Sequence, residues 1–91
     1  MDFEWDDEKS DRNARERGLP FKVAIKLFEG PTLEWDDRRW NYGERRICAI
    51  GWIGDRCFTC VYTWRDGRWR IISLRKASPG ESYAYGKTFL R

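Results

Sequence analysis

The sequence predicts a single α+β domain, spanning residues 1–91, in which helices pack on one face of an antiparallel sheet. Two observations support this class. Apolar residues recur at helical spacing before Pro31, whereas the chain beyond it is rich in β-branched and aromatic residues broken by short Gly-containing turns. A chain of 91 residues also has room for only one modest core.

The first elements are expected to be a short strand and a polar helix. Residues 3–5 are aromatic and flanked by charge, which suits an edge strand. Asp6 or Asp7 can then cap a helix that runs to about Arg17 and stops at Gly18. This helix is almost entirely polar, so we expect it to lie on the surface.

A second helix is predicted over residues 20–29. Pro20 suits its first position, and Gly30-Pro31 ends it. Its apolar residues recur at helical spacing, so this helix is expected to cover the sheet.

Four strands and a last helix follow. The strands are predicted at 32–36, 45–52, 56–64 and 68–75, and the helix at about 79–86. The last three strands are joined by short turns, so they should form an antiparallel meander. The predicted order is therefore β-α-α-β-β-β-β-α.

The three cysteines are interpreted as buried structural thiols. An odd number of cysteines without a secretory signal argues against a disulfide framework. Cys57 and Cys60 have CxxC spacing, which also occurs in zinc and redox sites. However, the chain has no histidine, and residues three apart on a strand face opposite sides of the sheet.

Charge is divided unevenly along the chain. Residues 1–44 carry 8 basic and 12 acidic side chains, whereas residues 45–91 carry 10 basic and 3 acidic ones. This asymmetry favours a basic face that binds a polyanion, although a merely solvated surface is the alternative. With no signal peptide and no apolar run of membrane-spanning length, we expect a cytoplasmic protein without membrane contact.

An ordered set of short motifs resembles the BrnT toxins of bacterial type II toxin–antitoxin pairs. The set comprises Glu4-Trp5-Asp6 with Lys9 and Asn13; Gly18 with Phe21, Ala24 and Phe28; Gly43-Glu44 with Arg46 and Ala49-Ile50-Gly51; Tyr62-Thr63 with Arg65; and Arg70-Ile71-Ile72-Ser73-Leu74-Arg75-Lys76-Ala77 with Glu81 and Tyr83 or Tyr85.

The resemblance implies a RelE-like fold, RNA cleavage and a cognate BrnA-like antitoxin. It also implies that the antitoxin binds DNA as a dimer and that the complex represses its own operon at operator DNA. Two positions depart from the family pattern. Glu16-Arg17-Gly18 replaces the usual Lys-His-Gly, and Leu74 stands where the family has alanine.

Arginines are the strongest candidates for catalysis. RNA supplies its own nucleophile, the 2′-hydroxyl, and a guanidinium is well shaped to stabilise the charge that builds on the phosphate during cleavage. We rank Arg75 first, followed by Arg65 and Arg46. Arg46 should lie near the Arg65 end of the sheet, with Arg75 at the opposite end. A solvated or acid-paired structural role is the alternative for each.

Proton transfer needs other groups, because the chain has no histidine. The candidates are Lys76, Tyr83, Tyr85 and Glu81. The two tyrosines point in different directions on a helix, so one of them can simply pack on the sheet. No carboxylate cluster or Cys/His set suggests a metal, so no metal or other cofactor is expected.

The tryptophans leave further alternatives. Trp64 and Trp69 flank a turn and suit either base stacking or cross-strand packing. Trp35 and Trp40 lie in an acidic segment, which favours a protein partner if they are exposed. The predicted function is a metal-independent endoribonuclease toxin. The alternatives are a non-catalytic nucleic-acid-binding module and a protein-interaction module.

Overall fold

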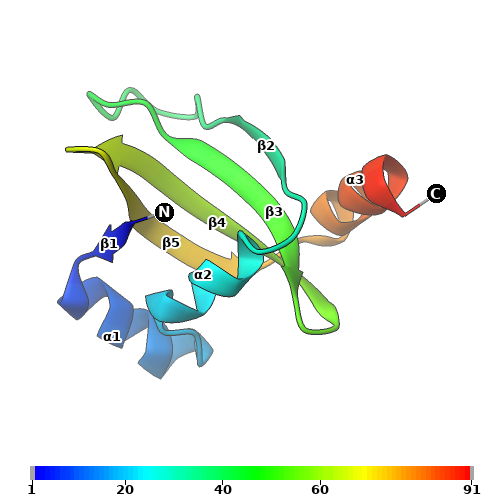
Figure 1. Ribbon diagram of the computed structural model, residues 1–91, viewed down its shortest axis with the longest axis horizontal. Helices are drawn as coiled ribbons and strands as arrows, with labels where there is room; N and C mark the ends of the chain where they lie inside the picture. The colour runs from blue at the N-terminus through cyan, green and yellow to red at the C-terminus, as the bar shows by residue number, and fades with distance from the viewer. Residues whose placement is uncertain (1, 91) are drawn as a thin grey trace.

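The computed structural model describes residues 2–90, which form a five-stranded sheet with three α-helices around it (Figure 1). This confirms the predicted α+β class. None of the helices in this part of the chain has the length and apolarity needed to span a bilayer. The elements are β1 (Phe3–Trp5), α1 (Asp7–Arg17), the 3₁₀ turn η1 (Phe21–Val23), α2 (Ala24–Leu27), β2 (Leu33–Asp36), β3 (Ile47–Ile53), β4 (Arg56–Arg65), β5 (Arg68–Lys76) and α3 (Pro79–Phe89).

The strands lie in the order β1-β5-β4-β3-β2. β2 to β5 pair antiparallel, as predicted, whereas the short edge strand β1 pairs parallel with β5. The β4–β5 hairpin turns at Asp66 and Gly67, which both have positive φ, 52° and 75°. This backbone suits an Asp-Gly turn. β1 and β5 are far apart in sequence, so no tight turn forces them into an antiparallel pair.

α1 has the predicted bounds, whereas the other two helices differ in length from those predicted. The expected helix at 20–29 is a 3₁₀ turn followed by four α-helical residues. Pro20 precedes it in an extended conformation, and the Phe28 amide bonds three residues back, to the carbonyl of Ile25. α3 continues past Gly86 to Phe89, and the Tyr85 and Phe89 rings make a tilted contact across that turn, with centroids 4.8 Å apart.

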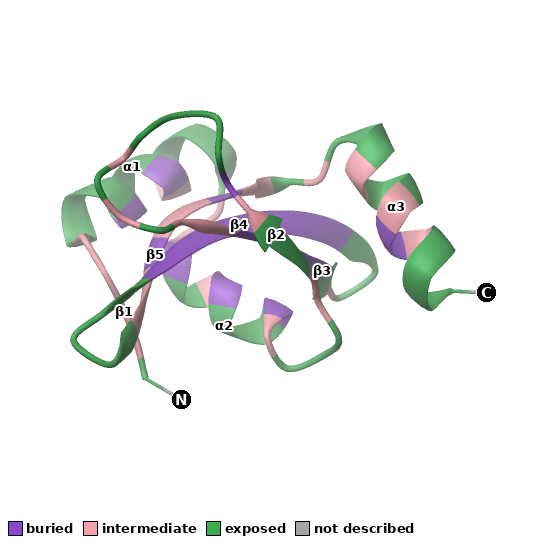
Figure 2. Cartoon of the chain, turned by 90° about the horizontal axis from the view of Figure 1, so that it is seen from above, coloured by how far each residue is buried: buried purple, intermediate pink, exposed green. Residues whose placement is uncertain are grey.

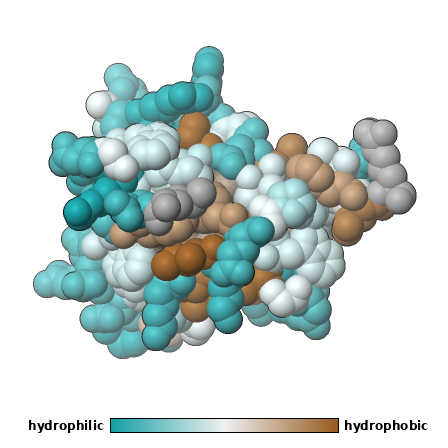
Figure 3. Space-filling view, viewed as in Figure 1, coloured by the Kyte–Doolittle hydropathy of each residue, from teal (hydrophilic) through white to brown (hydrophobic). Residues whose placement is uncertain are grey.

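The main core lies between the sheet and the segment formed by η1 and α2 (Figure 2). It includes Phe21, Leu27, Ala49 and Ile71, all almost completely buried. α2 sits very close to β3: a Cβ added to Gly51 would lie 2.9 Å from Cγ of Leu27. In the orientation of Figure 1, apolar side chains gather over the middle of the molecule, and hydrophilic side chains cover much of the surface around them (Figure 3).

α3 packs against a second, smaller cluster. Tyr85 of α3 joins Ile50 and Cys57 there. Ile50 neighbours Ala49 of the main core in sequence, so the alternation of β3 places it on the opposite side of the sheet. The prediction that the helices pack on one face is therefore wrong for α3, which packs against the other face. The same alternation separates Cys57 from Cys60, which belongs to the main core. All three cysteines are buried and free, which confirms their predicted structural role.

Hydrogen bonds attach the polar helix α1 to the rest of the fold. The Ser10 hydroxyl accepts a bond of 2.9 Å from the backbone N–H of Phe21. The Asn13 side-chain amide donates to the carbonyls of Leu19 and Leu74, at 2.7 and 2.9 Å. α1 is therefore positioned beside β5 by buried polar groups rather than by an apolar stripe.

Candidate functional site

Arg75 and Glu81 form a two-pronged ion pair where β5 ends and α3 begins. Nη1 and Nη2 of Arg75 donate to Oε1 and Oε2 of Glu81, at 2.7 and 2.9 Å. Oε1 also accepts bonds from the Ser78 amide, 2.8 Å, and the Thr59 hydroxyl, 3.0 Å. Glu81 belongs to the capping box of α3, with Ser78 as the N-cap. The helix start thus fixes the carboxylate, and the carboxylate fixes the guanidinium.

Both Glu81 and Arg75 remain ionised at neutral pH. The Arg75 guanidinium lowers the pKa of Glu81 to about 2, helped by the Ser78 amide, although burial opposes the shift. The same hydrogen bonds raise the pKa of Arg75. Glu81 is therefore an ionised, weakly basic carboxylate. Arg75 remains cationic, and its side chain is 36% exposed.

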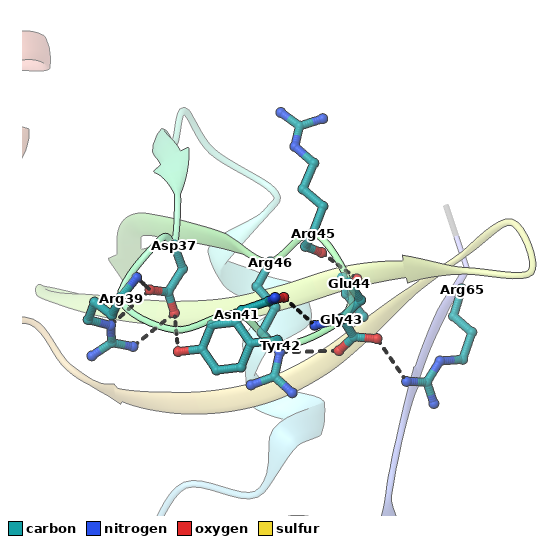
Figure 4. Close-up of polar contacts among 10 residues, drawn as sticks. Asp37, Arg39, Asn41, Tyr42, Gly43, Glu44, Arg45, Arg46 and Arg65 are labelled. Atoms are coloured by element: carbon teal, nitrogen blue, oxygen red, sulfur yellow. Dashed lines mark hydrogen bonds and ion pairs between the residues drawn. The ribbon is translucent and has the colours of Figure 1, made fainter.

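The loop of residues 37–46, between β2 and β3, places a second ion pair near the first. Asp37 is buried and accepts bonds of 2.8 and 2.9 Å from Nε and Nη2 of Arg39. The Tyr42 hydroxyl donates to the same carboxylate at 3.2 Å (Figure 4). These contacts, led by Arg39, lower the pKa of Asp37 to about 2. Arg39, Asp37, Arg75 and Glu81 line one surface cavity of about 380 Å³.

Arg46 and Arg65 share the carboxylate of Glu44, and we call these three residues with Tyr42 the Glu44 cluster. Nε of Arg46 and Nη2 of Arg65 each lie 3.1 Å from a Glu44 oxygen. The Arg46 guanidinium also stacks 3.9 Å from the Tyr42 ring centroid. Burial raises the pKa of Glu44, but bonds from Arg65 and Arg46 outweigh it and lower that pKa overall. Arg45 points away from the cluster (Figure 4).

The Glu44 cluster and Arg75 lie at opposite ends of the β4–β5 hairpin. Arg75 pairs with Thr59 of β4, whereas Arg65 pairs with Arg68 near the turn. Six residues of strand separate Thr59 from Arg65, which corresponds to about 20 Å. The structure thus brings Arg46 and Arg65 together, as the sequence predicted, and leaves Arg75 apart from both.

The remaining predicted residues are spread around α3 and the end of β5. Lys76 is exposed at the end of β5, and it lines one surface cavity together with Arg75. Tyr83 is 71% exposed. Tyr85 is 3% exposed, and its hydroxyl donates to the Pro31 carbonyl at 2.9 Å. Burial also raises the pKa of Tyr85. Tyr85 therefore packs the fold, and its hydroxyl is engaged.

The sequence left open whether Trp64 and Trp69 stack on bases or pack across the strands. In the structure they form a cross-strand pair. They are register partners in the β4–β5 hairpin, with ring centroids 5.5 Å apart in an edge-to-face arrangement. Trp69 also stacks on Tyr62 at 5.1 Å. This aromatic group caps the main core near the hairpin turn.

Sequence reasoning missed Arg39 and assigned Trp35 to a protein partner, whereas both line the cavity beside Arg75. Arg39 lies in a loop without periodicity, so no pattern places it. Trp35 pairs with Cys48 across β2 and β3, and Cys48 lines the same cavity. The alternation of side chains along β2 was the one available signal for placing Trp35 in this cavity. Using that signal required the register of β2 with β3.

Comparison with known proteins identifies the family of the chain. The sequence profile of a family described as "Ribonuclease toxin, BrnT, of type II toxin-antitoxin system" matches residues 5–81. This span covers every element from the end of β1 to the first turn of α3, including Arg46, Arg65, Arg75 and Glu81. No curated protein sequence matches the chain significantly. The chain belongs to the BrnT family of ribonuclease toxins of type II toxin–antitoxin systems.

Proposed function

We propose that this protein is an endoribonuclease that cleaves RNA without a metal ion, and that Arg75 stabilises the transition state. The observation that carries the proposal is the Arg75–Glu81 pair, which holds a permanently charged guanidinium at the rim of a cavity. Among the described residues, Glu81 and the Lys76 carbonyl engage three N–H donors of Arg75. Nε–H and one Nη2–H are left for a phosphate.

In the proposed reaction, the 2′-oxygen attacks the adjacent phosphorus. A P–O2′ bond forms, the P–O5′ bond breaks, and the products are a 2′,3′-cyclic phosphate and a 5′-hydroxyl. A fixed guanidinium contributes most to catalysis by stabilising the negative charge on the phosphorane oxygens. Glu81 is a positioning residue here, because a carboxylate with a pKa of about 2 is a poor base.

Lys76, Tyr83 and water are the groups that we propose for proton transfer. Lys76 is adjacent to Arg75 and exposed, and Tyr83 is exposed on α3. The chain has no histidine. We therefore expect a pH–rate profile without a titration near pH 6.5, the ordinary pKa of histidine.

The carboxylates around these sites support a mechanism without a metal. Four of them, Asp36, Asp37, Glu44 and Glu81, each accept a bond from at least one guanidinium, so a divalent cation would have to displace an arginine there. The pairs are Asp36 with Arg38 and Arg45, Asp37 with Arg39, Glu44 with Arg46 and Arg65, and Glu81 with Arg75.

Membership of a family of type II toxins supports the following proposal for the biological role. Cleavage of cellular RNA stops translation and growth in the cytoplasm, and a BrnA-like antitoxin neutralises the toxin by covering its arginines. In this proposal the antitoxin is dimeric and binds DNA, and the complex binds its own operator. Arg46 and Arg65 hold RNA phosphates at the far end of the sheet from Arg75.

The test is cleavage of a labelled RNA by the purified protein in EDTA. We expect cleavage with 2′,3′-cyclic phosphate ends, which a 2′-deoxy substitution at the cleaved nucleotide abolishes. Activity lost in EDTA and restored by magnesium would contradict the mechanism. RNA binding without turnover would favour the non-catalytic alternative.

A further inference from the structure

Two surface cavities meet at Arg75. The first, about 380 Å³, is lined by Trp35, Asp36, Asp37, Arg38, Arg39, Cys48, Arg75 and Glu81. The second, about 470 Å³, is lined by Glu16, Arg17, Leu19, Arg75 and Lys76. Arg75 is the residue common to both cavities. A bound polymer that passes over its guanidinium therefore has a cavity on either side.

The two cavities differ in charge. The second has three cations, Arg17, Arg75 and Lys76, against the single carboxylate of Glu16. The first has three arginines and three carboxylates, and each carboxylate is paired with a guanidinium. The second cavity therefore favours an anion, whereas the first is nearly neutral and suits a polar but uncharged group.

Trp35 gives the first cavity an aromatic wall. It lies on the edge strand β2 and is 41% exposed, so part of its ring is accessible to a ligand. Its strand neighbour Asp36 is held by Arg45 and Arg38. Arg39 reaches the same cavity with a side chain that is 66% exposed. An indole face and guanidinium planes are the surfaces on which nucleobases stack.

We infer that Trp35 forms a base-stacking subsite for single-stranded RNA, next to the phosphate bound by Arg75. The sugar–phosphate backbone crosses Arg75, a flanking phosphate lies in the second cavity against Arg17 and Lys76, and one base enters the first cavity against Trp35. This inference rests on the proposed function. It is an alternative to the prediction from sequence that Trp35 serves a protein partner, and it is favoured here because Trp35 and Arg75 line the same cavity.

Binding of a short RNA in which every ribose is 2′-O-methylated tests the inference, because such RNA cannot be cleaved. Trp35→Leu removes the ring but keeps an apolar side chain, and Trp35→Phe keeps a ring. Trp52→Leu is the matched control: Trp52 is 40% exposed, on β3, and lines neither cavity. We expect Trp35→Leu to weaken binding roughly 5- to 100-fold, with Trp35→Phe and Trp52→Leu close to the wild type.

Cleavable RNA gives a second readout. Trp35→Leu should raise KM more than it lowers kcat, and it should change which nucleotides flank the cleaved bonds. Equal affinities of Trp35→Leu and Trp52→Leu would overturn the inference. So would a Trp35→Leu variant that loses antitoxin binding but keeps RNA binding. If the wild type binds RNA through Trp35 yet never cleaves it, the subsite stands and the proposed ribonuclease activity fails.

Discussion

At the level of single residues, Glu81 links the end of β5 to the start of α3. Its carboxylate accepts four bonds, from Arg75, Ser78 and Thr59. A carboxylate in such surroundings stabilises the fold only while it is ionised. Its pKa falls from 4.5 to about 2 on folding, so the stabilisation is complete above pH 4.5 and is lost as pH falls toward 2.

Glu81→Gln should therefore destabilise the protein by about 2–3 kcal/mol at pH 7. The difference in unfolding free energy from the wild type should shrink as pH falls from about 4.5 to 2, because the wild-type carboxylate then becomes protonated. Urea denaturation at several pH values measures this. Glu29→Gln, an exposed carboxylate before β2, is the control. A difference that stays constant down to pH 2 would show that the pair contributes no ionisation-dependent stability.

At the level of elements, α1 is held by polar bonds, and Asn13 is their centre. Asn13→Ala removes two short bonds and leaves the Leu19 carbonyl without its donor. We expect a loss of about 2 kcal/mol in unfolding free energy. Asp11→Ala, an exposed position on the same helix, should change it by less than about 0.5 kcal/mol. Equal effects of the two variants would mean that other contacts hold α1.

Strands and turns were the most predictable elements. The hairpin turn at Asp66 and the α1 stop at Gly18 carry local signals, since each backbone has the positive φ that its sequence suggests. The second helix was overestimated because apolar residues at spacings of three and four fit a 3₁₀ turn as well as an α-helix. The parallel pairing of β1 with β5 depends on a contact between distant segments, which no local pattern encodes.

The candidate site was only partly predictable for the same reason. Arg46 and Arg65 begin and end neighbouring antiparallel strands, so topology alone places them together. The bond between Arg75 and Glu81 depends on where α3 begins and how it approaches β5. The position of Arg39 depends on the path of an irregular loop. The chemistry of the candidate residues could be predicted from their types, whereas the residues that lie next to them in the fold could not.

At the level of the whole molecule, the charge asymmetry of the sequence does not become two separate faces. Carboxylates from the acidic half pair with arginines of the basic half: Glu4 with Arg70, Asp36 with Arg45, and Glu44 with Arg65. These pairs join β1 to β5, β2 to the adjoining loop, and that loop to β4. Much of the basic charge is thus already neutralised, whereas Arg17 and Lys76 form no ion pair among the described residues and leave an excess of positive charge beside Arg75.

An antitoxin that neutralises the protein is therefore expected to place acidic residues at this excess. Mixing the protein with the product of the neighbouring gene should give a complex on gel filtration that neither binds nor cleaves RNA. Raising salt should weaken the complex, since charged contacts at its rim are screened. The double variant Arg17→Ala/Lys76→Ala should bind the antitoxin more weakly than Arg56→Ala, an exposed position on β4. Failure to form any complex would contradict this account of the partner.

The central claim is that Arg75 acts on the transition state of RNA cleavage. Arg75→Ala removes the charge, Arg75→Lys keeps it without the two-pronged geometry, and Arg68→Ala changes an exposed arginine at the other end of β5. Breaking the pair with Glu81 should cost about 1–2 kcal/mol of stability, so each variant's thermal midpoint must be measured and the assay run well below it.

The most direct measurement is the single-turnover rate of RNA cleavage by these variants in EDTA. We expect Arg75→Ala to lower the rate by about 10² to 10³, Arg75→Lys to recover part of it, and Arg68→Ala to match the wild type. A folded Arg75→Ala protein that cleaves RNA at the wild-type rate would contradict the account.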